Sequence, residues 1–226
     1  MLKKKILISG TSSGLGKFLY KEIKSVKFDR KKILGIYQKT NWDCIIHCGA
    51  YTGKSLKEIY ESIYTTYKLS KLKSVKFIFI SSMIIKDKNL SYYKMSKIIG
   101  EQILKEKKNL LILKLGSTIG NFMRDNTISK IIKNHKASIG LSKKSLYSFV
   151  SYSEILGFIK KSLKNNYKGQ YNFLRNDFTT LDKISKKLNK KVKFGNYYFK
   201  GINGSNKKIN KVFNLKKNST LDIILK

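Results

Sequence analysis

The sequence predicts an α/β fold in which a doubly wound parallel sheet is followed by a small C-terminal lobe. Two observations carry this prediction. Short apolar runs alternate with amphipathic helical segments over the first 120 residues, and the first run ends in a glycine-rich turn. The 226 residues suffice for one large domain or for one domain with a small appendage. We expect a core at residues 1–122, to which residues 145–175 return, and a lobe formed mostly by residues 123–226.

The first predicted unit is a strand, a glycine turn and a helix. Ile6 to Ile8 form an apolar run suited to a strand that is buried on both faces, and helical spacing begins after Gly14. Gly10 permits the sharp exit from the strand, Gly14 lets the backbone approach a ligand, and Gly16 leaves room for the helix on the sheet. The free N–H groups of such a helix start favour an anion. Glycines also end strands for structural reasons alone, but this placement predicts a Rossmann-like dinucleotide-binding turn.

A second strand is expected at Lys32 to Tyr37, after a helix from Gly14 to about Ser25. In dinucleotide-binding folds the end of this strand determines which cofactor is bound, and an acid there binds the ribose hydroxyls. Gln38 and Lys39 stand at that place here. Lys39 therefore favours NADP over NAD, and the alternative is one more solvated lysine.

The remaining elements continue the alternation. The strand Asp43–Ala50 follows almost at once, which leaves no room for another helix and strand, so the sheet is expected to be trimmed. The apolar pattern and the helix-capping residues predict further strands at 75–82, 110–115 and 169–173, and helices at 55–72, 92–106, 153–164 and 180–189. A terminal helix is expected from Ser219, and residues 195–210 are expected to form a polar loop.

The charge is strongly unbalanced, with 49 Lys and Arg against 13 Asp and Glu and a formal net charge of +36. Such a charge suggests a nucleic-acid or anionic-membrane partner. However, lysine is spread over every segment, and arginine, the usual reader of phosphate and base edges, is almost absent. Proline is missing and Lys, Ile and Asn are abundant, so we interpret most of the charge as compositional drift. An affinity for polyanions that fades with salt would still follow.

Two cysteines and a histidine share one predicted strand. Cys44 and Cys48 are four residues apart, about 13 Å, which is too far for a disulfide and suggests a reducing compartment. His47 points to the opposite face of the strand, so we expect no metal site. The apolar run after the basic N-terminus ends at Ser9, and we expect a cytoplasmic protein with no membrane partner.

Tyr93 and Lys97 are the candidate catalytic pair. Tyrosine and lysine at this spacing also occur elsewhere by chance, but this pair begins the helix after a buried strand that ends at Ser82. Helical spacing puts both side chains on one face, near the carboxyl end of the sheet. An adjacent ammonium lowers the pKa of a tyrosine, so Tyr93 would exchange a proton with a carbonyl or hydroxyl oxygen to which Ser82 hydrogen-bonds. The alternative is an exposed tyrosine beside a solvated lysine.

These motifs resemble the short-chain dehydrogenase/reductase superfamily, and within it the extended branch, the NAD-dependent epimerase/dehydratase family. The segment 43–50 is similar to the strand D-x-V-I-H-x-A-A, the segment 93–101 fits Y-x-x-S-K-x-x-x-E, and 149–156 resembles F-V-H-V-x-D. The glycine spacing is that of the superfamily's single-domain members. Ser62 stands where the resemblance places an asparagine of a catalytic tetrad, and the arginine that grips a nucleotide diphosphate is replaced near Tyr147.

The resemblance implies an NAD(P)-dependent oxidoreductase that reduces or epimerises a sugar or nucleotide sugar held by the C-terminal lobe. It implies catalytic roles for Ser82, Tyr93 and Lys97. The expected cofactor-binding residues are Gly10, Ser12, Ser13, Gly14, Leu15, Gly16, Lys39, Cys48, Gly49, Ala50, Tyr93 and Lys97. It also implies a homodimer through the helices 55–72 and 91–107, unless their apolar residues all face the sheet. The alternative function is a non-catalytic member of the fold that senses NADP or binds nucleic acid.

Overall fold

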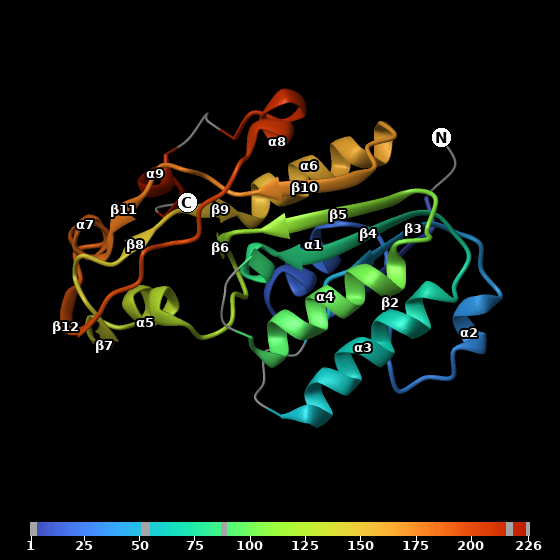
Figure 1. Cartoon of the computed structure of the whole chain (residues 1–226), viewed down its shortest axis with the longest axis horizontal. Coiled ribbons are helices and arrows are strands. Elements are labelled where there is room, and N and C mark those ends of the chain that lie inside the picture. Colours follow the sequence, from blue (N-terminus) through green and yellow to red (C-terminus); the bar gives the residue numbers. More distant parts are fainter. Residues whose placement is uncertain (1–3, 51–54, 87–89, 216–218, 225–226) are drawn as a thin grey trace.

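A computed structural model describes residues 4–50, 55–86, 90–215 and 219–224 (Figure 1). Its centre is a six-stranded sheet formed by Ile6–Ser9 (β1), Val26–Lys27 (β2), Trp42–His47 (β3), Ser74–Ser82 (β4), Leu110–Leu115 (β5) and Gly169–Phe173 (β10). The strand order is β10-β5-β4-β3-β1-β2, and every neighbouring pair is parallel. The order reverses at β1, which lies between β2 and β3. Ligands of open parallel sheets bind at the carboxyl end of such a reversal.

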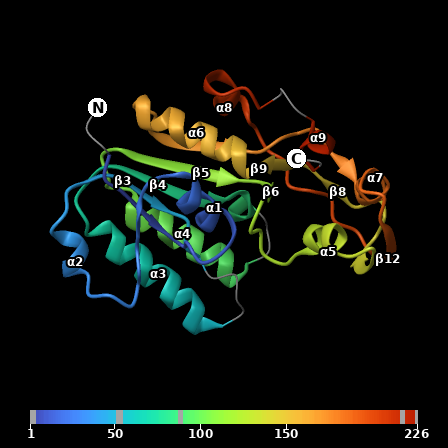
Figure 2. The ribbon, with the colours of Figure 1, turned by 180° about the vertical axis from the view of Figure 1, so that it is seen from behind.

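Helices cover both faces of the sheet. Gly14–Glu22 (α1) and Tyr152–Lys164 (α6) lie on one face, and Leu56–Ser70 (α3) and Tyr92–Leu104 (α4) on the other. The alternation along β4 shows the reason, because Ile78 and Ile80 belong to the core under α1 and α6, whereas Phe77 and Phe79 belong to the core under α3 and α4. The helix α1 is behind the strands in Figure 1 and in front of them in Figure 2. The predicted doubly wound fold is therefore confirmed.

A second group of elements lies beyond the carboxyl ends of the strands, at the left of Figure 1. It contains Thr127–Lys133 (α5), Lys136–Leu141 (β7), Leu146–Tyr147 (β8), Thr179–Thr180 (β11), Leu181–Lys187 (α7), Lys191–Tyr197 (β12) and Thr220–Ile224 (α9). Paired strands β7–β12 and β8–β11 and a separate hydrophobic cluster, which includes Ile131, Phe149 and Leu181, hold it together. Ser117–Ile119 (β6) pairs with Phe149–Ser151 (β9) and leads the chain into this group and back.

Capping groups fix where several helices begin and end. Ser151 and Glu154 form the predicted capping box of α6, and the Thr180 side chain accepts a hydrogen bond from the Lys183 N–H at the start of α7. At the other end of α6, the Lys76 ammonium donates to the carbonyl oxygens of Ser162 at 2.7 Å and Asn165 at 3.3 Å. These are among the carbonyl groups that a helix end leaves without an intrahelical partner.

Two predicted segments differ from the structure. The apolar residues at 32–37 do not form the second strand. The chain passes through the two-residue β2 earlier, and Gly35–Gln38 is a short helix (α2) in which Ile36 is exposed. The strand was missed because both of its residues are exposed and only Phe28, which follows them, enters the core. The expected loop 195–210 also begins inside β12 and ends in a helix, Lys207–Val212 (α8).

Among the helices of the described residues, none combines the length and the apolar composition needed to cross a membrane.

Candidate active site

The glycine turn has the backbone geometry that its sequence predicts. Gly10 has a φ of +75°, and a Cβ atom there would lie 2.5 Å from the backbone nitrogen of Gly49. A Cβ atom on Gly16 would lie 2.1 Å from the carbonyl oxygen of Gly10. Gly16 therefore lets α1 start directly against the turn. From the sequence we expected Gly16 to leave room between the helix and the sheet, whereas the close contact is with the backbone of Gly10.

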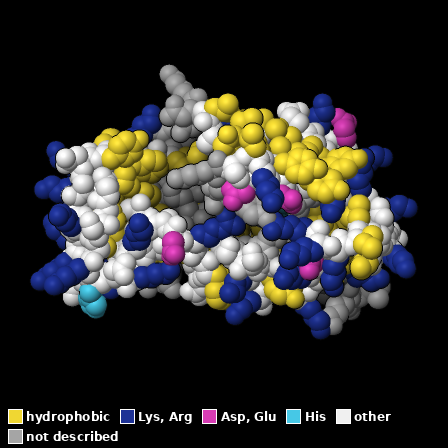
Figure 3. All heavy atoms as spheres, turned by 90° about the horizontal axis from the view of Figure 1, so that it is seen from below, with side chains coloured by type: hydrophobic (Ala, Val, Ile, Leu, Met, Phe, Trp, Pro, Cys, Tyr) yellow, Lys and Arg dark blue, Asp and Glu magenta, His cyan; other side chains and the backbone are white. Residues whose placement is uncertain are grey.

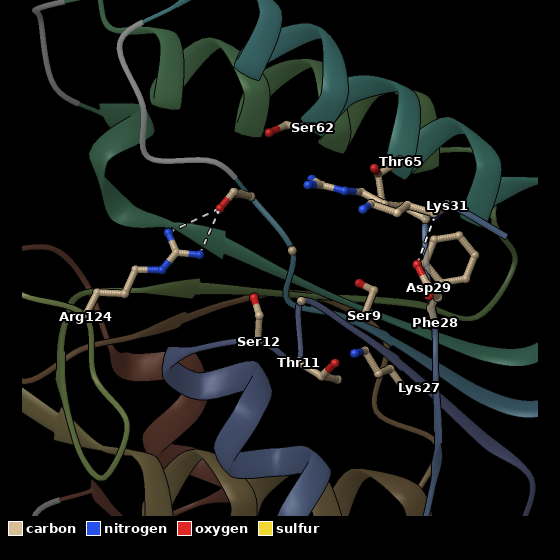
Figure 4. Close-up of a pocket in the computed structure, with 14 residues that line it drawn as sticks. Ser9, Thr11, Ser12, Lys27, Phe28, Asp29, Lys31, Ser62, Thr65 and Arg124 are labelled. Atoms are coloured by element: carbon tan, nitrogen blue, oxygen red, sulfur yellow. Dashed lines mark hydrogen bonds between the residues drawn. The ribbon is translucent and has the colours of Figure 1, made fainter.

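Two cavities lie at the carboxyl end of the sheet. The larger has a volume of about 450 Å³, and its lining is polar and basic on the side of β2 (Figure 4). It is lined by Ser9, Gly10, Thr11, Ser12, Lys27, Phe28, Asp29, Arg30, Lys31, Gly49, Ala50, Ser62, Thr65 and Arg124. The smaller cavity, of about 240 Å³, contains the predicted catalytic residues and shares Gly10, Ala50 and Arg124 with the larger.

The structure places Ser82, Tyr93 and Lys97 together on the wall of the smaller cavity. Ser82 ends β4, while Tyr93 and Lys97 face the cavity from the first two turns of α4, whose N-cap is Ser91. A side-chain hydrogen bond joins Tyr93 to Ser82. The Lys97 ammonium lies 5.6 Å from the centre of the Tyr93 ring and donates to the carbonyl oxygen of Ile80 at 2.6 Å. A phenol hydroxyl, a serine hydroxyl and an ammonium group are thus within reach of one bound group, an arrangement that can exchange a proton with it.

The electrostatics of the pair differ from the sequence prediction. Burial raises the pKa of Tyr93, and the hydrogen bond to Ser82 and the positive charge of Arg124 oppose that rise. Burial also lowers the pKa of Lys97, to about 8, because a buried ammonium loses its hydration. Arg124 acts on Lys97 in the same direction. Arg124 is thus a cation that favours the Tyr93 phenolate and that the sequence did not predict.

Polar residues behind the cavity fix α4 and β4 against each other. Glu101 accepts a hydrogen bond from the Ser81 hydroxyl at 2.6 Å and pairs with the Lys114 ammonium at 3.0 Å. Ser62, where the sequence resemblance places a tetrad asparagine, donates to the carbonyl oxygen of Glu58 and lines the larger cavity with Thr65. Ser62 does not line the smaller cavity that contains Tyr93.

His47 is buried next to the turn and holds β1 and β3 to α3. Its Nδ1 atom lies 2.6 Å from the Ser9 hydroxyl and its Nε2 atom 2.8 Å from the Thr66 hydroxyl. Burial lowers the pKa of His47 to about 3, so the ring is neutral at physiological pH. The histidine of the D-x-V-I-H segment thus aligns the strand end that lines the larger cavity.

The start of α1 is less open to an anion than predicted. The Gly14 N–H donates to the carbonyl oxygen of Phe122 at 2.6 Å, and the Leu15 N–H donates to the Tyr152 hydroxyl. Both N–H groups were expected to be free. The residues between β6 and α5 contribute the first of these contacts and α6 the second, which sequence spacing alone does not reveal.

The cofactor-selecting position also differs. Lys39 follows α2, is exposed and lines neither cavity, because the second strand lies earlier in the chain. Asp29, Arg30 and Lys31 follow β2 and line the larger cavity instead, and the Asp29 carboxylate accepts a hydrogen bond from the Lys31 N–H at 3.0 Å (Figure 4). The sequence did contain a signal for this part of the larger cavity, namely a carboxylate followed by two cations just after a short strand.

The other predicted cofactor residues are divided between the two cavities. Gly10, Ser12, Gly49 and Ala50 line the larger, and Gly10, Ser13, Gly14, Leu15, Gly16, Cys48, Ala50, Tyr93 and Lys97 line the smaller. Arg124 lines both and was not predicted.

No protein-family model and no curated protein sequence matches this chain. Solved structures do match it over nearly their whole length. A dTDP-4-dehydrorhamnose reductase from Bacillus anthracis in complex with NADP superimposes with a TM-score of 0.76 and 19% identity, over 99% of this chain and 98% of that one. A UDP-glucuronic acid 4-epimerase from Bacillus cereus in complex with UDP-glucuronic acid and NAD has a TM-score of 0.81 and 17% identity, over 98% and 96%.

An NAD-dependent NDP-hexosamine 5,6-dehydratase of tunicamycin biosynthesis matches with a TM-score of 0.79 and 12% identity, over 99% of this chain and 96% of that one. Reductase, epimerase and dehydratase thus share one architecture with this chain. The chain therefore has the fold of the extended short-chain dehydrogenases/reductases, the NAD-dependent epimerase/dehydratase group that its motifs resemble.

Proposed function

We propose that this protein is an NAD(P)-dependent oxidoreductase that acts on a hydroxyl or carbonyl group of a sugar or nucleotide sugar. The observation that carries the proposal is the meeting of Ser82, Tyr93 and Lys97 in a cavity that shares its wall with the glycine turn. A tyrosine hydrogen-bonded to a serine beside a buried cation is suited to proton exchange with a carbonyl oxygen.

Tyr93, Ser82 and the two nearby cations have different roles in this reaction. The Tyr93 hydroxyl gives its proton to the substrate oxygen during reduction and takes it back during oxidation. The Ser82 hydroxyl hydrogen-bonds that same oxygen and orients it toward Tyr93. Lys97 and Arg124 keep the surroundings positive, which favours the phenolate when the proton has left.

The two cavities fit a dinucleotide. The larger one, next to β2, would hold the adenosine half, and the residues of the smaller one, which include Tyr93, would hold the nicotinamide half, with the glycine turn at the boundary. A bound nicotinamide supplies the hydride donor or acceptor. The buried hydroxyl of Thr11 has no hydrogen-bond partner among the described residues and lines the larger cavity, which is consistent with a ligand there. The matched reductase and epimerase were solved with NADP and with NAD.

The substrate class rests on the matched structures, whose substrates are sugars attached to nucleotides. Net reduction and epimerisation through a transient keto group use the same proton exchange, and both belong to the proposal. We further propose that residues 1–122 with 145–175 form the dinucleotide-binding core and that most of residues 123–226 bind the substrate. A cytoplasmic location is likewise proposed from the sequence.

The test is Tyr93→Phe, with Tyr92→Phe as the matched control because Tyr92 is the neighbouring tyrosine and does not line either cavity. The wild-type enzyme is assayed with keto-sugars and nucleotide sugars, and cofactor affinity is measured by nicotinamide fluorescence. Tyr93→Phe should abolish turnover and leave cofactor affinity within about twofold, since the hydroxyl acts on the substrate. Full turnover by Tyr93→Phe would remove this mechanism.

We also propose that the protein forms a homodimer through α3. Leu56, Tyr60, Tyr64 and Tyr67 are exposed and follow one another at helical spacing, so the apolar residues of this helix do not all face the sheet. Seen from below in Figure 3, hydrophobic side chains gather on the side of the molecule where α3 lies. An apolar stripe of this kind is typical of an interface between copies of a chain.

A further inference from the structure

The segment between β6 and α5 crosses over the glycine turn, and we refer to residues 121–124 as the strap. Its Phe122 has a φ of +67° and gives its carbonyl oxygen to the Gly14 N–H. The ammonium groups of Lys17 and Lys21 lie 4.9 and 4.6 Å from the centre of the Phe122 ring. The strap is thus attached to the first two turns of α1 by a hydrogen bond and by cation–π contacts.

Arg124 ends the strap and reaches across the cleft to the turn after β3. Its Nε atom donates to the Ser13 hydroxyl at 3.0 Å, and its two terminal nitrogens donate to the carbonyl oxygen of Ala50 at 3.3 Å each. Figure 4 shows the Arg124 side chain entering the cleft from the opposite side to Asp29 and Lys31. The guanidinium thus lies between the turn after β1 and the turn after β3, which is the place where the strand order reverses. We call this place the crossing point.

That crossing point is also the boundary between the two cavities. Of the described residues that line either cavity, only Gly10, Ala50 and Arg124 line both, and Arg124 is the only charged one among these three. A dinucleotide that places one half in each cavity must pass its pyrophosphate through this boundary.

The groups that would otherwise bind an anion here are partly engaged. The N–H groups of Gly14 and Leu15 donate to Phe122 and Tyr152, so the helix start offers fewer donors than the glycine pattern suggests. A guanidinium binds phosphate oxygens in a bidentate manner and supplies a full positive charge.

We propose that Arg124 binds the pyrophosphate of the dinucleotide and so replaces helix N–H groups as the main anion ligand of this site. On binding, its contact with the Ala50 carbonyl oxygen gives way to phosphate oxygens, while Ser13 and the strap keep the guanidinium in place. The inference rests on the proposed function, because it assigns a residue to the cofactor of that function.

The test compares wild type with Arg124→Met and Arg124→Lys, and Lys144→Met controls for the loss of one exposed positive charge. Titration calorimetry at physiological salt uses NADPH, NADH, ADP-ribose, which contains the pyrophosphate, and adenosine, which does not. Arg124→Met should weaken NADPH, NADH and ADP-ribose by about tenfold to a hundredfold, the usual effect of losing a charged hydrogen-bond donor. Adenosine affinity should not change, Arg124→Lys should recover part of the loss, and Lys144→Met should bind like wild type.

The outcomes separate the two proposals. If wild type binds the dinucleotides and Arg124→Met binds them equally well, the inference about Arg124 is wrong and the proposed function stands. The inference is also wrong if Arg124→Met loses adenosine and ADP-ribose to the same degree, because the residue would then support the cavity as a whole. If wild type binds none of the four compounds, the proposed function itself fails. Thermal unfolding of each apo variant checks that the fold is intact.

Discussion

Lys97 donates a 2.6 Å hydrogen bond to the main-chain carbonyl oxygen of Ile80, and this contact fixes the ammonium group at the wall of the smaller cavity. Both residues are almost completely buried, so the charge is held where water does not hydrate it. The free energy of unfolding should therefore depend on whether Lys97 is protonated.

The first prediction concerns pH. The pKa of Lys97 is about 8 in the folded protein, against 10.5 for a lysine side chain exposed to water, so the folded state releases this proton first as the pH rises. The buried ammonium group therefore lowers the free energy of unfolding by its full amount below pH 8. This destabilisation is lost as the pH rises from 8 to 10.5. Relative to Lys97→Met, the free energy of unfolding of wild type should rise by about 3 kcal/mol across this window. Urea unfolding at several pH values measures it; Lys144→Met should follow wild type, and a pH-independent difference would contradict the prediction.

A second prediction tests the tight start of α1. Gly16→Ala places a Cβ atom 2.1 Å from the carbonyl oxygen of Gly10, and neither backbone is free to move away. The free energy of unfolding should fall by about 1–3 kcal/mol or more, as expected for overpacking. Gly140→Ala is the control, since nothing lies within 4 Å of its added Cβ atom, and should change stability by less than about 0.5 kcal/mol. Equal stability of the two variants would mean that the turn tolerates a side chain.

Cofactor choice provides a third prediction. Lys31→Ala should weaken NADPH by about tenfold relative to NADH, because it removes a cation from the side of the larger cavity where a ribose phosphate would lie. Lys39→Ala should leave the ratio of the two affinities unchanged, since Lys39 lines neither cavity. Fluorescence titrations of both variants decide the matter. A shift caused by Lys39→Ala alone would restore the original sequence-based assignment.

The fourth prediction concerns the apolar stripe on α3. Tyr60→Lys puts a charge at the middle of the stripe and should convert a dimer to a monomer in light scattering. Tyr198→Lys is the control, because Tyr198 is an exposed tyrosine outside α3, and it should remain dimeric. A monomeric wild type at tens of micromolar would remove the interface.

The sequence predicted the parts of the fold whose residues are buried on both sides. Strands β3, β4 and β5 each contain a short apolar run that is buried, and the capping boxes mark where helices begin, so both were recognisable. The edge strand β2 was not, because both of its residues are exposed and the neighbouring apolar residues at 33–36 attracted the assignment. Pairing between β7 and β12, which are about fifty residues apart in the chain, leaves no local signal.

The candidate site was predictable where a motif fixes the spacing within one element. Tyr93 and Lys97 share a helix, and Ser82 ends the strand before it, so their meeting follows from local structure. Arg124 is different, since it reaches the site only through the path of the strap after β6. No periodicity in the sequence predicts that path, so the effect of Arg124 on the pKa of Tyr93 could not be predicted.

Lys76 of β4, whose ammonium group contacts the end of α6, indicates how a chain so rich in lysine can bury some of these side chains. Lys76 is joined in the interior by Lys94, Lys97 and Lys114, and the ammonium groups of Lys76, Lys97 and Lys114 each contact a carbonyl oxygen or a carboxylate. Outside the catalytic set, Lys76 and Lys114 show that the chain buries a lysine where a carbonyl oxygen or a carboxylate accepts a hydrogen bond from its ammonium group. Chemical labelling should distinguish these four buried lysines from the exposed ones. Reductive methylation of the native protein would spare the four amines and reach them only after unfolding. Mass spectrometry of the labelled peptides would then give a direct reading of folding at four interior positions.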